Sequence, residues 1–554
     1  MSAFVHVGQC GNQLGAAYWQ LVGSDDDHDS EDRKGLSAPL AKPRKASPPL
    51  RAVYASSPAT PSLYYEHFFL RPSRKARCVL VDTEPKVIRS MLESDDVHSV
   101  CRVWPRHHEP AFVHFEQSGR GNNWAMGYNF QRFRRNVIPS KTAMAQAHTT
   151  IASSKSRQRP VVKFTPFDED KRELVDLTMD SLRKLIESTD CYQGTVLMHS
   201  LGGGTGSGLG CRLMELIRDT YPKAYLVAAS VAPSWKCGDT PLQNYNSVFT
   251  LAHLQEHADC IIYKENDELL RTSGYWKALL RAQTQEQSQQ DNLIGNLASS
   301  GLPSYRVSID EMNHLAAADL AGLLFPLVPE SKIAPSRAAS ARPFDFGKLI
   351  HDLCPLHSAK FLDVRTGVLT GKSSSSRSAS TKASKSDPTL FHAGICQHPL
   401  TLRSGSDDEI ESILNKLVRQ TAQSFPRSAS HTLSSSAIIR GFPSPNDCNR
   451  STKLQAAVAS AFPGVSWNSD YHIAVSHSPS TPFPSNGGKA SITLCVNNGH
   501  VLTSAEQYLQ RAERQFKARA YVHWYMQHGL EEAHFQDVFE KSRQLIAEYK
   551  DLLR

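Results

Sequence analysis

The chain has 554 residues, which is more than one ordinary hydrophobic core can organise and predicts two or three globular parts. It contains no run of 18 or more apolar residues, and its N-terminal stretch lacks the basic start and long apolar centre of a signal peptide, so we expect an intracellular protein without membrane insertion. The net charge of +8 would suit a nucleic-acid partner, but the basic residues concentrate in Ser- and Pro-rich segments, so no nucleic acid is expected.

Eleven cysteines are scattered along the chain from Cys10 to Cys495, with no CxxC pair and no His/Cys cluster at zinc spacing. This pattern indicates reduced thiols rather than a disulfide framework. Cysteine ligation of a metal is therefore not expected.

Five segments are expected to be insertions or linkers. Residues 24–62 change from an acidic run, SDDDHDSED, into a Pro- and Ser-rich basic stretch without an apolar period. The others lie near residues 142–160, 302–342, 371–390 and 476–488. Their basic tracts can bind polyanions or form solvated, phosphorylatable loops, and the composition favours the loops.

Between the insertions, strand and helix patterns alternate. RCVLVDTEP at 77–85 and TVLMHS at 195–200 are short apolar runs that end in turn residues, which is typical of buried parallel strands. Leu209, Leu213 and Ile217 then fall on one face of a helix. The alternation predicts an α/β domain over residues 1–300, with its ligand at the carboxyl ends of the strands.

From residue 504 the chain shows two long helical patterns, broken near Gly529. Their aromatic residues, Tyr521, Trp524, Tyr525 and Phe535, are expected to be core or interface residues rather than a ligand site.

The stretch HSLGGGTGSGLG at 199–210 holds six glycines between a predicted strand and a predicted helix. Such a turn presents free backbone N–H groups and the positive end of a helix to a phosphate. A P-loop would need a lysine after Gly208, where Leu209 stands, and the spacing of a dinucleotide GxGxxG also fails. A tight structural turn is the remaining alternative, but the density of glycines favours an anion site.

This glycine run resembles the signature loop of tubulins, and further stretches resemble the same family in the same order. They are VGQCGNQLG at 7–15, VLVDTEPKVI at 79–88, GRGNNWAMGY at 119–128, DTPLQNYNSVFTLAHL at 239–254, KENDELL at 264–270 and KARAYVHWYMQHGLEEAHF at 517–535. Within the family, DTEPKVI, the ENDEL box and the short non-acidic C-terminus look most like delta-tubulin.

The resemblance implies a tubulin-like fold. It consists of a Rossmann-type, parallel-sheet GTP-binding domain over residues 1–300, a central helix, a smaller α+β intermediate domain over residues 301–500 and a C-terminal helical hairpin over residues 501–554. It also implies GTP or GDP as the ligand, together with Mg²⁺.

The residues that match the family's phosphate, ribose and base contacts are Gln9, Cys10, Asp82, Glu84, Gly121, Asn122, Ser200, Gly203, Gly204, Thr205, Gly206, Asp239, Gln243, Asn266 and Asn292. Asp82 and Glu84 match an acidic loop near the γ-phosphate, where Mg²⁺ would separate like charges. Asp82 as a plain turn residue is the alternative.

Some matched positions depart from the family pattern. Arg120 stands where other tubulins usually have a small residue, so it would either contact phosphate or crowd it. Gln243 replaces a glutamate near the ribose, and Asn292 matches a base-contacting asparagine if the register slips by one. The aromatic residue that stacks on the base is missing, which would weaken affinity.

The stretch FDFGKLIHDLCPLHSAKFLDVR resembles the loop and helix that one tubulin subunit inserts into the nucleotide site of the next. Asp345 matches a family aspartate, but Lys348 takes the place of the glutamate that activates the hydrolytic water. A protonated lysine cannot serve as that base, so this subunit is not expected to trigger hydrolysis in a neighbour.

The favoured hypothesis is a delta-tubulin-like structural subunit of the cytoplasmic cytoskeleton, at most a weak GTPase. It would act at the centriole, basal body, cilium or flagellum, with alpha/beta-tubulin and epsilon-tubulin as partners. The alternatives are an active polymerising GTPase and a nucleotide-independent microtubule-binding scaffold.

Overall fold

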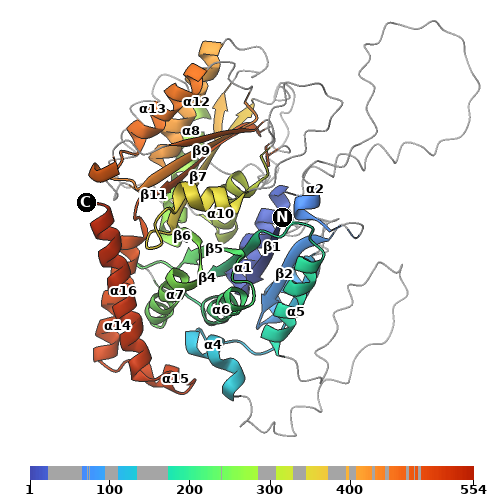
Figure 1. Ribbon diagram of the computed structural model, residues 1–554, viewed down its shortest axis with the longest axis vertical. Coiled ribbons are helices and arrows are strands. Elements are labelled where there is room, and N and C mark those ends of the chain that lie inside the picture. The colour runs from blue at the N-terminus through green and yellow to red at the C-terminus, as the bar shows by residue number, and fades with distance from the viewer. Residues whose placement is uncertain are drawn as a thin grey trace, which may run out of the picture.

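Figure 1 shows a computed structural model of the chain, in which a twisted sheet runs through the molecule between layers of helices. The structure describes residues 1–22, 65–70, 73, 75–93, 110–133, 173–236, 238, 240–284, 307–327, 345–371, 395–398, 407–426, 431–442, 448–468, 473–478, 481–483 and 488–554.

The first part of the sheet is parallel, with its strands in the order β3-β2-β1-β4-β5-β6. This is the doubly wound order in which ligands bind where the strand order reverses. The strands are β1 (Ser2–Val7), β2 (Ala76–Asp82), β3 (Pro110–Phe115), β4 (Gly194–Ser200), β5 (Tyr225–Ala232) and β6 (Cys260–Glu265). The reversal lies between β1 and β4, so a crevice is expected beyond Val7 and Ser200. The predicted strands at 77–85 and 195–200 are confirmed as β2 and β4.

Helices cover both faces of this sheet because successive strand residues point to opposite sides. One core includes Phe4 with residues of α1 (Gly8–Val22), α2 (Tyr65–Phe68), α3 (Pro85–Glu93), α8 (Asn266–Thr284), α10 (Ile309–Leu324) and α11 (Phe346–Leu353). The opposite core includes Val5 with residues of α4 (Trp124–Phe133), α5 (Leu174–Glu187), α6 (Gly210–Thr220) and α7 (Gln243–His257). Leu209, Leu213 and Ile217 are buried in this second core, as the helical stripe predicts.

The sheet continues beyond β6 into a mixed part that forms the upper half of Figure 1. Its strands are β7 (Phe361–Gly371), β8 (Ile395–His398), β9 (Ser434–Arg440), β10 (Ala474–Ser478) and β11 (Gly488–Asn497). β7 pairs in parallel with β6 through only two residue pairs, and β11 lies antiparallel between β7 and β9. Helices α12 (Asp407–Gln423) and α13 (Cys448–Ala461) pack on β7, β9 and β11 through a third core.

Helix α10 corrects the sequence analysis, which treated residues 302–342 as an insertion. Residues 309–324 within that segment form a core helix, which begins with a capping box between Ser308 and Glu311. Its run LAAADLAGLL is buried because the helix is enclosed by α1, α8, β7 and β11. From Leu315 onward, the apolar residues therefore cover all sides of the helix instead of one face, and no amphipathic period marks this part.

The C-terminal residues form α14 (Val501–Lys517), the short α15 (Val522–Met526) and α16 (Glu532–Leu552). Helices α14 and α16 lie side by side along one flank and pack on α7 (Figure 1). Gly529 has φ +85°, which confirms the predicted break. Tyr525 and Phe535 are buried as predicted, while Trp524 is 43% exposed.

None of the helices in the described part of the chain is long and apolar enough to span a membrane.

Candidate functional site

The glycine run and the start of α1 meet at the crevice between β1 and β4. Gly8, the first residue of α1, has φ +72°, and a Cβ there would lie 2.9 Å from the backbone nitrogen of Gly206. Only glycine allows both this left-handed conformation and this close approach. Gln9 and Cys10 follow in the first turn of α1 and are exposed and half-buried, respectively. The backbone N–H groups of this turn have no partner within the helix.

The glycine run folds into a π-helical turn, Thr205–Leu209, that leads directly into α6. A Cβ on Gly206 would lie 2.5 Å from the Oγ atom of Ser200, whereas one on Gly203 would meet only that same Oγ atom at 3.9 Å. Gly206 is thus buried against β4, and Gly203 borders open space. Single π-helical turns inside helices are frequent at functional sites.

A second turn closes on the glycine run from α4. Gly121 and Asn122 both have φ +52°, and a Cβ on Gly204 would lie 2.6 Å from the carbonyl oxygen of Arg120. The buried Asn246 on α7 fixes both loops, because its Nδ2 atom donates to the carbonyl oxygens of Asn122 and Gly202 at 2.7 Å each. The two loops therefore form one rigid cradle.

Asp82 ends β2 beside this cradle. Its Oδ1 atom accepts hydrogen bonds from the backbone N–H groups of Thr83, at 2.7 Å, and Glu84, at 3.3 Å. Burial raises the pKa of its carboxyl to about 6, although these two hydrogen bonds oppose the shift. The hydroxyl groups of Thr83 and Thr205 lie 2.6 Å apart, so the acidic loop is bonded to the glycine run. Glu84 is exposed, with its carboxylate lying over Gly119.

Arg120 does not extend toward the cradle. Its guanidinium forms a buried ion pair with Glu116 at 2.6 Å and donates to the backbone oxygen of Ser118 at 2.6 Å. The sequence suggested a phosphate as the partner of Arg120, but the carboxylate of Glu116 forms the charge-assisted hydrogen bond instead. The cradle is therefore spared a bulky side chain at this position.

The predicted base and ribose contacts lie at the ends of β5 and β6. Asn266 is half-buried and begins α8 immediately after β6. Gln243 is buried at the start of α7 and donates from Nε2 to the carbonyl oxygen of Ser234 at 2.9 Å. Asp239 and Asn292 lie outside the described residues. The contacts of Gln243 and Asn266 with a nucleotide remain predictions.

Asp345 and Lys348 lie at the end of the sheet opposite the cradle, where the parallel strands begin. Asp345 caps α11, since its Oδ1 atom accepts a hydrogen bond from the backbone N–H of Lys348 at 3.2 Å, and both residues are exposed. The neighbouring Phe346 shares a small cavity with Met1 and Ser2, at the amino end of β1. Asp345 and Lys348 are therefore separated from the cradle by the length of the strands, and one molecule cannot bring Lys348 to its own glycine run.

Comparison with known proteins identifies the family of the domain that contains this cradle. Residues 2–134 and 146–274 match the GTPase domain of the Tubulin/FtsZ family. The GTPase domain of the chain belongs to this family. It is 26% identical to a tubulin beta-1 chain of Suillus bovinus over 99% of this chain and 95% of the relative. It is 24% identical to the human tubulin beta-1 chain, covering 99% and 92%, and 25% identical to the mouse tubulin epsilon chain, covering 100% and 96%.

Membership in the Tubulin/FtsZ family implies that the domain binds GTP or GDP, and the residues of the cradle fit the phosphates of such a ligand. Gly203 borders open space, Gly8 brings the first turn of α1 against the glycine run, and hydroxyl groups of Thr83 and Thr205 lie alongside. Backbone amides and hydroxyls are the donors that phosphate oxygens need.

The sequence analysis missed three residues that hold the cradle together. Besides Asn246 and Thr83, Asn12 on α1 donates to the carbonyl oxygens of Gly8, at 2.9 Å, and Val81, at 3.0 Å, and so ties α1 to the end of β2. Asn12 and Asn246 are both fully buried. An asparagine on the apolar face of a predicted helix is the signal that could have identified them, because buried amides are retained with hydrogen-bond partners.

Proposed function

We propose that the protein is a delta-tubulin-like structural subunit that binds a guanine nucleotide and serves in the assembly or stability of centriolar, basal-body and ciliary or flagellar microtubules. The observation that carries the nucleotide part is the single cradle formed by α1, the glycine run and the turn at Gly121, at the point where the strand order reverses. The delta-like assignment is supported by DTEPKVI and the ENDEL box. The identities to beta- and epsilon-tubulins are too similar to distinguish subfamilies.

Each group of the site has a role in this proposal. Backbone N–H groups of residues 203–206 and of the first turn of α1 would hold the phosphates, and Asn266 would bond to the guanine edge with both donor and acceptor of its amide. Asp82 and Glu84 would hold Mg²⁺, which neutralises phosphate charge when bound. Asp82 is rigidly placed by two backbone amides, while the exposed Glu84 can adjust.

The positions of the cradle and of α11 support head-to-tail assembly with alpha/beta-tubulin and epsilon-tubulin. The two lie at opposite ends of the parallel strands, so a heterologous contact would place the first turn of α11 against the cradle of the next subunit. The residue presented there is Lys348, whose ammonium group cannot accept a proton from water. We therefore infer a subunit that completes an interface and promotes little GTP hydrolysis in its neighbour.

The first test is the nucleotide content of the purified full-length chain. Denaturation is expected to release close to one GTP or GDP per wild-type chain and much less from Thr205→Val, which removes a hydroxyl that bonds to Thr83 beside the phosphates. Thr178→Val is the control with the same change of side chain, because the buried Thr178 donates to the carbonyl oxygen of Leu174 within α5 and not to a residue of the cradle. Absence of nucleotide from the wild type, or equal loss from both variants, would contradict the proposal.

The second test concerns the place of action. A fluorescently tagged chain, expressed in ciliated cells, is expected to concentrate at centrioles and basal bodies rather than along the whole microtubule network. Uniform labelling of cytoplasmic microtubules would instead indicate an ordinary lattice subunit and overturn the delta-like assignment.

A further inference from the structure

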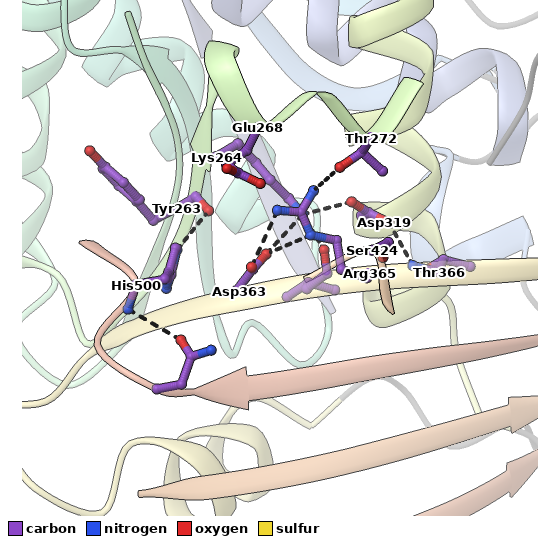
Figure 2. A network of polar contacts seen from close by, with 12 residues as sticks. Tyr263, Lys264, Glu268, Thr272, Asp319, Asp363, Arg365, Thr366, Ser424 and His500 are labelled. Atoms are coloured by element: carbon purple, nitrogen blue, oxygen red, sulfur yellow. Dashed lines mark hydrogen bonds and ion pairs between the residues drawn. The ribbon is translucent and has the colours of Figure 1, made fainter. Parts of the chain in front are cut away.

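Four charged side chains form a buried cluster beneath the start of α8, shown in Figure 2. Lys264 donates from Nζ to Asp319 Oδ2 at 2.6 Å and lies 3.7 Å from Asp363 Oδ1, while Arg365 Nε lies 3.0 Å from that same Oδ1 atom. None of the four side chains is more than 4% exposed. Two cations and two carboxylates make the cluster neutral, which satisfies the rule that buried charges are paired.

The cluster connects three elements that are distant in sequence. Lys264 lies on β6, Asp319 on α10, and Asp363 and Arg365 on β7. Asp319 Oδ1 also accepts a hydrogen bond from the backbone N–H of Thr366 at 2.7 Å, and Lys264 also donates to the carbonyl oxygen of Val364. These bonds matter locally because β6 and β7 share only two paired residues of the sheet ladder.

Arg365 extends this cluster to α8. Its Nη1 atom donates to Thr272 Oγ1 at 3.4 Å, and Thr272 is buried on the inner side of the helix. A second arginine acts from α8 itself: Arg271 pairs with Glu268 at 2.8 Å and donates to the carbonyl oxygen of Ser424, just beyond α12. Helix α8 thus contacts β7, a strand of the mixed part of the sheet, and the end of α12, a helix that packs on that part.

Helix α8 begins with Asn266, the residue proposed to bond to guanine. A helix moves as a unit, so a shift of its second turn at Thr272 is transmitted to its first residue. A hydrogen-bonding site loses specificity when its donor and acceptor are displaced by about 1 Å. The hydrogen bond from Arg365 to Thr272 opposes such a displacement of α8.

We propose that Arg365, supported by Asp363, is a positioning residue for guanine recognition, holding α8 so that Asn266 faces the base. This inference rests on the proposed nucleotide-binding function and adds to it that base selectivity is set from the mixed part of the sheet. Stability alone does not account for the cluster, because a buried charge network can often be replaced by apolar residues without loss of stability. A substitution that removes one charge of the cluster leaves its buried partner unpaired and lowers the free energy of unfolding. The test therefore uses variants that keep the charges of the cluster.

The experiment compares affinities of the full chain for GDP and IDP, which lacks the exocyclic amino group of guanine. Thr272→Val removes the hydroxyl that Arg365 reaches without changing a charge, and Arg365→Lys keeps the charge but not the two-sided reach of the guanidinium. Both are expected to lower the preference for GDP over IDP by about tenfold. Lys360→Met is the matched control: Lys360 is a buried cation just before β7 that donates to the carbonyl oxygens of Gln255 and Ala258, away from α8.

The outcomes distinguish the positioning role of Arg365 from the proposed nucleotide binding. A reduced GDP preference in both test variants, with an unchanged preference in Lys360→Met, supports the positioning role even if all three variants unfold more easily. A wild-type preference that persists in Thr272→Val and Arg365→Lys overturns the positioning role and leaves nucleotide binding intact. A wild-type chain that binds GDP and IDP equally overturns guanine recognition and the positioning role, and a wild-type chain that binds neither nucleotide overturns the proposed function as well.

Discussion

At the residue scale, Glu265 is an unusual group, since it ends β6 immediately before Asn266 and is 8% exposed. Its Oε1 atom is buried without a hydrogen-bond partner among the described residues. Burial, together with the nearby carboxylates of Glu268, Asp363 and Asp267, raises the pKa of this carboxyl from 4.5 to about 7, and a hydrogen bond with Ser504 opposes the shift. Glu265 therefore exchanges its proton near neutral pH in the folded state.

This shift predicts how the stability of the protein depends on pH. A raised folded-state pKa means that the favourable contribution of the protonated Glu265 is fully present below pH 4.5 and is lost as the pH rises through about 7. The shift corresponds to roughly 3 kcal/mol. Glu265→Gln, which stays neutral, is expected to unfold at a higher denaturant concentration than the wild type at pH 8, with a smaller difference at pH 5.5. Equal differences at both pH values would contradict a titrating Glu265.

The same scale explains why the partners of two side chains could not be predicted from the sequence. Arg120 is surrounded by Glu116 and Ser118, which lie within four residues of it, but the sequence does not show that the turn at Gly121 directs the guanidinium back toward them. Asn246 bonds to two loops that lie 124 and 44 residues before it in the chain. Such contacts depend on chain segments that meet only after folding.

At the scale of elements, the sequence predicted the strands and helices that have one buried face or a short apolar run. β2, β4 and α6 were predicted because their flanks carry turn residues or glycines. Helix α10 was missed because its part from Leu315 onward is buried on all sides and consequently has no polar face. The glycine run was correctly placed between a strand and a helix, but its π-helical turn follows from close packing on Gly8 and β4, which no local pattern encodes.

At the scale of the whole molecule, the cradle and α11 lie at opposite ends of the strands. In the proposed head-to-tail assembly, Lys348 of one subunit would therefore lie at the nucleotide of its neighbour and influence hydrolysis there. The exposed Lys348 can be replaced without disturbing the core, since only its backbone N–H bonds to Asp345.

This arrangement predicts a gain of function. In mixtures of the chain with alpha/beta-tubulin and GTP, Lys348→Glu is expected to raise phosphate release by at least about tenfold, since the carboxylate can accept a proton from water where the ammonium cannot. Lys348→Gln is the control, because it removes the positive charge without adding a base. If both variants raise phosphate release equally, the charge of Lys348 rather than the missing base limits hydrolysis.

The sequence by itself indicated the family through the resemblance of its motifs, and it predicted parallel strands and a glycine-rich loop between a strand and a helix, because glycine spacing and strand ends are local features that impose backbone geometry. Asp82, Thr205 and the residues of the glycine run were therefore predicted as neighbours of one ligand. Only the tertiary structure decided that Asn246 joins the two loops, that Arg120 pairs with Glu116 and that Arg365 holds α8. These are pairings of buried polar groups, and their partners are fixed by burial and chain topology rather than by spacing along the chain.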